Sequence, residues 1–146
     1  MRPLSELEAV FETPITTPDV HAAADELLNA SEEVLEHWIR AHGGEPTNDT
    51  REGFRLLALH RQGAKDDPSF NACRETCREV AYHYNLVTTR DVYSDITDRL
   101  NMMQMVSKHL FLFISGKMQV AELGDFCCSS KPVRSTDAAS KQLEEA

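Results

Sequence analysis

Residues 17–44 read TPDVHAAADELLNASEEVLEHWIRAHGG, and this stretch indicates how the chain folds. Its small and apolar side chains recur at spacings of three and four, which is typical of one stripe along an amphipathic helix. The stripe comprises Val20, Ala23, Ala24, Leu27, Leu28, Ser31, Val34, Leu35, Trp38 and Ile39. Thr17 is the expected N-cap, Pro18 the expected first helical residue, and Gly43-Gly44 the expected end. One long helix with a single buried face is therefore predicted.

Three further segments carry helical spacing. The first is expected to open between residues 47 and 50 and to close at Gly63. Asp67-Pro68 then repeats the signature of a cap followed by proline, and a long helix is expected over residues 91–115. The segment after Asp67-Pro68 carries a strict 3-4-3-4 seam formed by Phe70, Cys73, Cys77, Val80 and Tyr84.

The expected fold is all-α, a single-domain bundle of four to five main helices with mostly antiparallel neighbours. The chain has 146 residues, a length that suits one domain. Residues 1–128 are assigned to the bundle. Residues 129–146 are polar and poor in large apolar side chains, so a mobile C-terminal tail is expected there. Gly116 is the expected end of the last long helix, and residues 118–123 are ambiguous between a helical turn and a short strand.

The charge of the chain is strongly segregated. The net charge is −9, and residues 1–50 account for all of it, with eleven acidic and two basic side chains. This balance disfavours a general nucleic-acid binder and a protein that coats anionic membranes. The longest apolar run, residues 110–114, is far shorter than the roughly 20 residues of a membrane span, and no targeting segment is visible. A cytoplasmic protein is therefore expected.

The predicted helix over residues 91–115 has two apolar sides. Ile96, Leu100, Met103 and Leu110 lie along one side. The second side is formed by Met102, Met105, His109 and Leu112, about half a turn away at 100° per residue. A helix that is apolar on two sides is buried on both, either at the centre of the bundle or against another subunit. These four residues are the candidate interface.

The leading functional hypothesis is a non-enzymatic protein-interaction or regulatory module that forms a homo-oligomer, such as a homodimer, or binds another protein. It rests on the two-sided helix, the segregated charge and the absence of a catalytic signature from the sequence. Methionines at 102, 103 and 105 would add the adaptable surface that is found at many protein interfaces. An enzyme whose active site has no sequence signature is a further possibility, and no cofactor is expected under the leading hypothesis.

The alternative hypothesis is a thiol-based metal or redox site. Cys73 and Cys77 are one helical turn apart, and Cys127 and Cys128 could complete a four-ligand set from a later loop. Thiolates suit zinc, copper in its Cu(I) state, or an iron–sulfur cluster. Because Cys73 and Cys77 lie in the apolar seam, and free cysteine is among the most buried residue types, core packing is the favoured interpretation of this pair.

Two arginine pairs carry a further ambiguity. Arg51 and Arg55, and likewise Arg74 and Arg78, are four residues apart, so each pair would form a basic strip on a helix. Such strips could bind phosphate or an acidic partner. The favoured interpretation is pairing within the chain, because the acidic side chains of the first long helix would lie beside these arginines in a bundle. Those side chains are Glu26, Glu32, Glu33 and Glu36.

Overall fold

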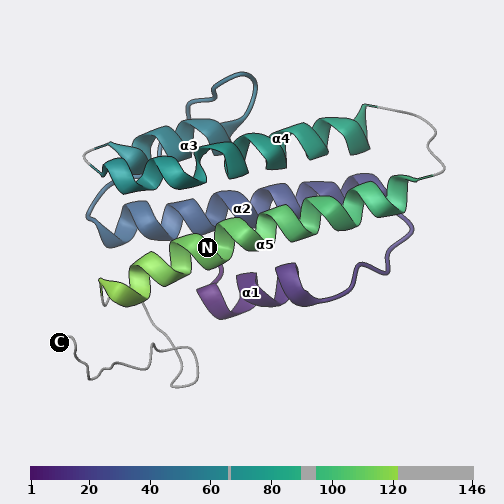
Figure 1. The fold of residues 1–146 in the computed structure, drawn as a ribbon, viewed down its shortest axis with the longest axis horizontal. Helices are drawn as coiled ribbons and strands as arrows, with labels where there is room; N and C mark the ends of the chain where they lie inside the picture. Colours follow the sequence, from purple (N-terminus) through teal and green to yellow (C-terminus); the bar gives the residue numbers. More distant parts are fainter. Residues whose placement is uncertain (66, 90–94, 122–146) are drawn as a thin grey trace.

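The computed structural model of the chain describes residues 1–65, 67–89 and 95–121, which form an all-α bundle (Figure 1). These residues contain five α-helices, one 3₁₀ helix and no strand. The elements are α1 (Leu4–Glu12), α2 (Val20–Ala41), α3 (Arg55–Ala64), the 3₁₀ helix η1 (Pro68–Cys73), α4 (Arg74–Thr88) and α5 (Ile96–Val120). The predicted tail over residues 129–146 and its boundary at residue 128 lie outside the described residues.

The caps of α2 follow from its flanking residues, with one correction. Asp19 is the N-cap, and its carboxylate accepts a hydrogen bond from the backbone amide of Ala22 at 3.0 Å. The prediction of Thr17 as the cap is wrong, because its hydroxyl instead accepts from the amide of Asp19 at 3.2 Å. An aspartate cap also places negative charge at the positive end of the helix dipole. The predicted end is confirmed, since Gly43 takes the left-handed conformation with φ of 81°.

The start of α3 differs from the expectation that a helix opens between residues 47 and 50. Arg51 and Phe54 exchange backbone hydrogen bonds of 2.9 and 3.0 Å across a tight turn. The two residues inside this turn, Glu52 and Gly53, have φ of 55° and 86°, which no right-handed helix accommodates. The helix therefore begins only at Arg55, after the turn is complete.

The signature Asp67-Pro68 begins a helical segment as predicted. The Asp67 carboxylate accepts from the backbone amide of Ser69 at 3.2 Å. The first six residues form the 3₁₀ helix η1, and α-helical geometry begins only at Arg74. Phe70 and Cys73 of the seam therefore lie on η1, while Cys77 lies on α4.

Helix α5 extends beyond its predicted end. Gly116 does not terminate it, and the helix continues to Val120. Met118 is buried, and the ammonium of Lys117 lies 3.5 Å from the Asp67 carboxylate and 5.3 Å from the centre of the Trp38 ring. These contacts offset the low helix propensity of a glycine. Residues 118–120 are thus helical, whereas the expected start at residue 91 lies outside the described residues.

Helix α1 is an element that the sequence analysis did not assign. Leu4, Leu7 and Phe11 have helical spacing and are all buried. The ring of Phe11 lies 5.7 Å from that of Phe111 on α5. At the end of α1, the side-chain amide of Gln104 donates to the backbone carbonyl of Val10 at 3.0 Å and to that of Thr13 at 2.8 Å. The short helix is therefore held by tertiary contacts with α5, as isolated helices of this length are not stable.

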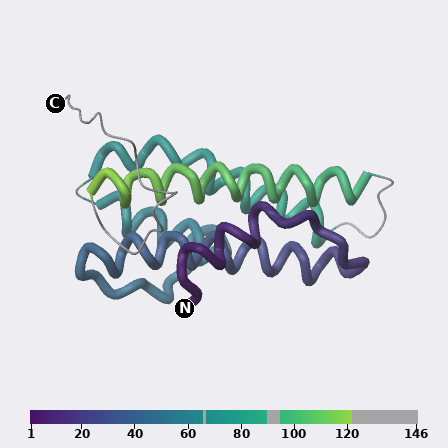
Figure 2. The backbone as a smooth tube through the Cα atoms, turned by 90° about the horizontal axis from the view of Figure 1, so that it is seen from below, coloured from purple at the N-terminus to yellow at the C-terminus, as the bar shows by residue number. Residues whose placement is uncertain are grey.

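The central helix is α2, which packs against α1, α3, α4 and α5. Trp38 near its end lies beside Lys117 near the end of α5, so these two helices run in the same direction (Figures 1 and 2). The hydroxyl of Tyr84 near the end of α4 donates to Asp25 near the start of α2 at 2.7 Å, so α4 runs antiparallel to α2. Helix α5 is in turn antiparallel to α4, so the expectation of mostly antiparallel neighbours holds for α4 against α2 and against α5, whereas α5 runs parallel to α2.

Aromatic side chains close one end of the core. The rings of Trp38 and Phe70 stack with centres 5.0 Å apart, and the indole N–H of Trp38 donates to the Gly63 carbonyl at 3.3 Å. A Cβ atom at Gly63 would lie 3.0 Å from the Phe70 ring and 3.2 Å from the Trp38 ring. An alanine at this position would therefore require one of the two rings to move by a few tenths of an ångström.

Candidate functional site

The candidate interface lies on the outward face of α5. Met102, Met105 and Leu112 are 44%, 47% and 49% exposed, and His109 between them is exposed as well. The opposite face of the helix is buried against the bundle through residues such as Leu100, Met103, Leu110 and Ile114. The two apolar sides predicted for this helix are therefore present, but only one of them is covered by the described part of the chain.

The exposed face extends beyond the four predicted residues. At 100° per residue, Gly116 and Val120 follow Leu112 on the same side of the helix. Val120 is 73% exposed, and a Cβ atom at Gly116 would meet nothing within 4 Å. We call this surface the α5 strip; it consists of Met102, Met105, His109, Leu112, Gly116 and Val120. It spans 19 residues of helix, roughly 27 Å from the first to the last at 1.5 Å per residue, and its six residues include no acidic, lysine or arginine side chain.

The position of α5 explains why this face stays uncovered. Helix α5 packs on α2, with α4 along one flank and α1 along the other. In Figure 1 it crosses in front of α2, between α4 above and α1 below. Figure 2, turned by 90°, shows α5 in the outer layer of the bundle. Among the helices that the structure describes, α5 therefore does not take the central position in the bundle, which is one of the two arrangements open to a helix with two apolar sides.

The cysteines of the seam are buried, as core packing predicts. Cys73 is 1% exposed and Cys77 is fully buried. The Cys73 thiol donates to the backbone carbonyl of Phe70 at 3.2 Å, and the ring Nε2 of His60 lies 2.9 Å from the same oxygen. His60 comes from α3, so the fold brings this histidine to the cysteine pair. Sequence reasoning missed this, because nothing in the spacing between His60 and Cys73 reports a contact between helices.

The surroundings of this cluster shift the pKa values of its members. A hydrogen bond with Cys77 lowers the pKa of Cys73, while burial opposes the shift and His60 reinforces it. The pKa of Cys77 shifts in the opposite direction. The hydrogen bond with Cys73 and burial both raise it. Burial lowers the pKa of His60, but bonds with Cys73 and the Phe70 carbonyl outweigh it and raise the pKa overall. Cys73 is therefore the more acidic thiol of the pair.

The described residues hold no group of three or more histidine, cysteine, aspartate or glutamate side chains placed to bind a metal ion. Cys73 and Cys77 are together, but Cys127 and Cys128, the other members of the hypothetical four-ligand set, lie outside the described residues. A site for zinc, copper or an iron–sulfur cluster that uses all four thiols thus remains a hypothesis.

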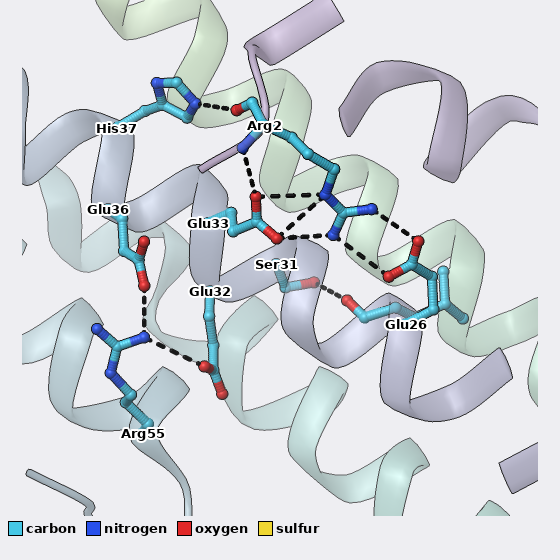
Figure 3. Close-up of polar contacts among 9 residues, drawn as sticks. Arg2, Glu26, Ser31, Glu32, Glu33, Glu36, His37 and Arg55 are labelled. Atoms are coloured by element: carbon cyan, nitrogen blue, oxygen red, sulfur yellow. Dashed lines mark hydrogen bonds and ion pairs between the residues drawn. The ribbon is translucent and has the colours of Figure 1, made fainter. Parts of the chain in front are cut away.

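Two arginines connect the acidic side of α2 to the rest of the bundle (Figure 3). The guanidinium of Arg55 pairs with Glu36 and lies 3.4 Å from Glu32. The guanidinium of Arg2 lies 2.7 Å from both Glu26 and Glu33. Pairing within the chain is therefore confirmed for Arg55, whereas the partner of Glu26 and Glu33 comes from the N-terminal segment.

The remaining predicted arginines behave differently. Arg78 forms two hydrogen bonds of 2.9 and 3.0 Å with the carboxylate of Glu52, a residue of the turn before α3 and not of α2. Neither Arg51 nor Arg74 has an ion pair with any residue in the described ranges. The idea that the acidic face of α2 neutralises both arginine pairs is thus correct for Arg55 alone.

No protein family model, curated protein or solved structure matches the chain. None of the helices in the described residues is long and apolar enough to cross a membrane.

Proposed function

We propose that this chain is a non-enzymatic protein-interaction or regulatory module that forms a homodimer through the α5 strip. The observation that carries the proposal is the exposure of Met102, Met105 and Leu112, each nearly half accessible on one face of one helix. Scattered apolar side chains are normal on a protein surface, but a continuous strip of them marks an interaction site.

The energetics of the α5 strip favour association. Complete burial of a leucine or methionine side chain contributes about 1.5–3 kcal/mol, so covering the exposed half of each contributes about 1 kcal/mol. No carboxylate, ammonium or guanidinium would be desolvated along the strip, which removes the largest cost of burying a surface. Methionine side chains also adapt to the shape of a partner.

A second copy of the chain is the partner that this surface suits. In a dimer with twofold symmetry the α5 strip would pack on itself, so that apolar residues meet apolar residues on both sides. The negative charge of the chain would otherwise repel another copy. The acidic residues paired in Figure 3 lie on α2. The α5 strip lies on the face of α5 that points away from α2, so these acidic residues would not face a second copy.

Sedimentation velocity of the full chain over a range of concentrations tests this proposal. We expect the wild type to form dimers, and Met105→Glu and Leu112→Glu to be folded monomers, because both sites are exposed in the single chain. Tyr82→Glu is the matched control, since Tyr82 is 59% exposed on α4 and does not belong to the strip. A wild-type monomer at the highest concentration, or equal dissociation of the control, would refute the proposal.

A thiol-based metal or redox site is the second candidate function. The observation in its favour is the contact of Cys73 with both Cys77 and His60, which makes Cys73 the more acidic thiol. Native mass spectrometry of the full chain as purified, before any chelator is added, distinguishes the two functions. We expect a dimer without metal. One equivalent of zinc, copper or iron per chain would favour the thiol site instead.

A further inference from the structure

A cationic cavity of about 320 Å³ lies between α3 and the segment formed by η1 and α4. It is lined by four arginines, by His60, and by neutral residues; no acidic residue is among the described residues that line it. The arginines are Arg51, Arg61, Arg74 and Arg78. Arg51 comes from the turn before α3, Arg61 from α3, and the other two from the first half of α4. Such a concentration of positive charge is unexpected in a chain with a net charge of −9.

The pairing of the arginines singles out this cavity. Eight arginines lie in the described ranges, and five of them have a carboxylate partner: Arg2, Arg40, Arg55, Arg78 and Arg99. The other three, Arg51, Arg61 and Arg74, form no ion pair with any part of the chain that the structure describes. All three line the cavity. Among the arginines that the structure describes, those without a carboxylate partner therefore all lie at this cavity.

We propose that this cavity binds a pyrophosphate group, either free or as part of a nucleoside diphosphate. Guanidinium groups present paired N–H donors that match the oxygens of a phosphate. Two linked phosphates carry roughly three negative charges near neutral pH, which equals the number of arginines without a partner. Bringing three like charges around one cavity is unfavourable until a counter-charge enters it.

The walls of the cavity are suited to a small ligand. Its volume lies at the lower end of the range of about 300–1,000 Å³ that is usual for small-molecule sites. His60 is 6% exposed and fixed by its contact with the Phe70 carbonyl, so the inner wall is rigid. Arg78 is held by Glu52, which leaves the three unpaired arginines as the groups that would close around the ligand.

A second cavity of about 720 Å³ adjoins the first and shares Arg51 and Arg61 with it. Its other polar lining residues are Thr47, Asp49, Thr50, Gln62 and Lys65. Hydroxyl and amide groups of this kind could hydrogen-bond the sugar of a nucleoside. A nucleoside diphosphate would then place its phosphates among the arginines and its nucleoside part in the larger cavity.

Isothermal titration calorimetry of the full chain with sodium pyrophosphate and with ADP, in a buffer free of phosphate and sulfate, tests the proposal. We expect wild-type binding, and a loss of affinity of about tenfold or more for Arg61→Gln and for Arg74→Gln, because each removes a charge-assisted hydrogen bond. Both side chains are exposed, so the variants should fold. Arg40→Gln is the matched control, since Arg40 is exposed and lies on α2.

The two ligands separate the two sources of the pyrophosphate group. Tighter binding of ADP would assign a nucleoside diphosphate, and equal or tighter binding of pyrophosphate would assign the free anion. Absence of heat and of any thermal stabilisation with both ligands would overturn the proposal. So would an equal loss of affinity in Arg40→Gln, because binding would then follow total charge and not this cavity. Without ligand, the triple variant Arg51→Gln/Arg61→Gln/Arg74→Gln should have a higher melting temperature than the wild type. Neither ligand should raise the melting temperature of this variant.

Discussion

Arg2 binds Glu33 through both its backbone amide and its side chain. The backbone amide of Arg2 donates to Oε1 of Glu33 at 2.9 Å, and the guanidinium donates to Oε2 at 2.7 Å (Figure 3). The same guanidinium also donates to Glu26 at 2.7 Å. A ring nitrogen of His37 lies 2.6 Å from the Arg2 carbonyl, so the residue is bound on three sides by α2. This contact sets where α1 begins on the surface of the central helix.

Replacing Arg2 should therefore destabilise the fold more than replacing an ordinary surface arginine. The Glu33 side chain is only 19% exposed, so its bonds are worth more than the 0–1 kcal/mol or so of a solvent-exposed pair. We expect Arg2→Ala to lower the free energy of unfolding by about 1–2 kcal/mol in urea titrations. Arg40→Ala, whose pair with Glu45 spans 3.9 Å on the surface, should change it by less than about 0.5 kcal/mol. Equal effects of the two variants would contradict this ranking.

The same contact predicts a dependence of stability on pH. Burial raises the pKa of Glu33, but the hydrogen bonds from Arg2 outweigh it and lower the pKa overall. A carboxyl whose pKa is lower in the folded state stabilises the fold above its unfolded pKa, about 4.3 for glutamate. This contribution is lost as the pH falls through the lower, folded pKa.

Urea titrations at a series of pH values below 6 measure this contribution. We expect the stability difference between wild type and Glu33→Gln to shrink steadily as the pH falls below about 4.3, because the wild-type carboxyl then becomes neutral as well. Asp49→Asn is the control, since Asp49 is exposed and has no ion pair among the described residues. A difference that stays constant through this range would show that the charge of Glu33 is not what stabilises the contact.

The parts of the fold that follow from local pattern could be predicted from the sequence. The stripe of α2, the glycine at its end and the aspartate before Pro68 each act through neighbours within a few residues. Helix α1 could not be found in this way, because its nine residues are helical only while Phe11 packs on Phe111. The continuation of α5 past Gly116 depends in the same manner on distant partners of Lys117.

The candidate sites also differ in whether they depend on local pattern or on packing between distant elements. The exposed residues of α5 could be predicted, because helical periodicity alone puts Met105 and Leu112 opposite the core. The position of His60 beside Cys73 and the gathering of three unpaired arginines could not, since each joins elements whose relative placement is set by packing. Spacing of four residues suggested that Arg51 and Arg55 share one helix, but the turn at Gly53 separates them.

The seam cysteines should behave as core residues in the folded protein. We expect Cys73→Ala and Cys77→Ala each to lower the free energy of unfolding by about 1–2 kcal/mol, because each leaves a small cavity. Alkylation by iodoacetamide followed by mass spectrometry should label both thiols only as fast as the protein opens, since neither is accessible in the folded state. Rapid labelling of Cys73 in the native protein would contradict this, and would show that its lowered pKa is accompanied by access from solvent.

Two buried serines on facing helices allow a matched test of hydrogen bonding in this core. Ser31 on α2 and Ser107 on α5 are both fully buried. The Ser31 hydroxyl donates to the Leu27 carbonyl at 2.8 Å, whereas the Ser107 hydroxyl has no partner among the described residues. An unsatisfied buried hydroxyl costs about 1–3 kcal/mol, while a satisfied one contributes about 1 kcal/mol.

Substitution of each serine by alanine should therefore shift stability in opposite directions. Alanine favours a helix interior by about 0.5 kcal/mol over serine, and this gain is common to both sites and cancels in the comparison. We expect Ser107→Ala to raise the free energy of unfolding by about 1 kcal/mol and Ser31→Ala to lower it by about 0.5 kcal/mol, as measured by urea titration. If both variants are stabilised equally, the gain reflects helix propensity alone. If Ser107→Ala is destabilised, the hydroxyl is hydrogen-bonded in solution, and the close packing of α5 on α2 leaves room for a partner such as a water molecule.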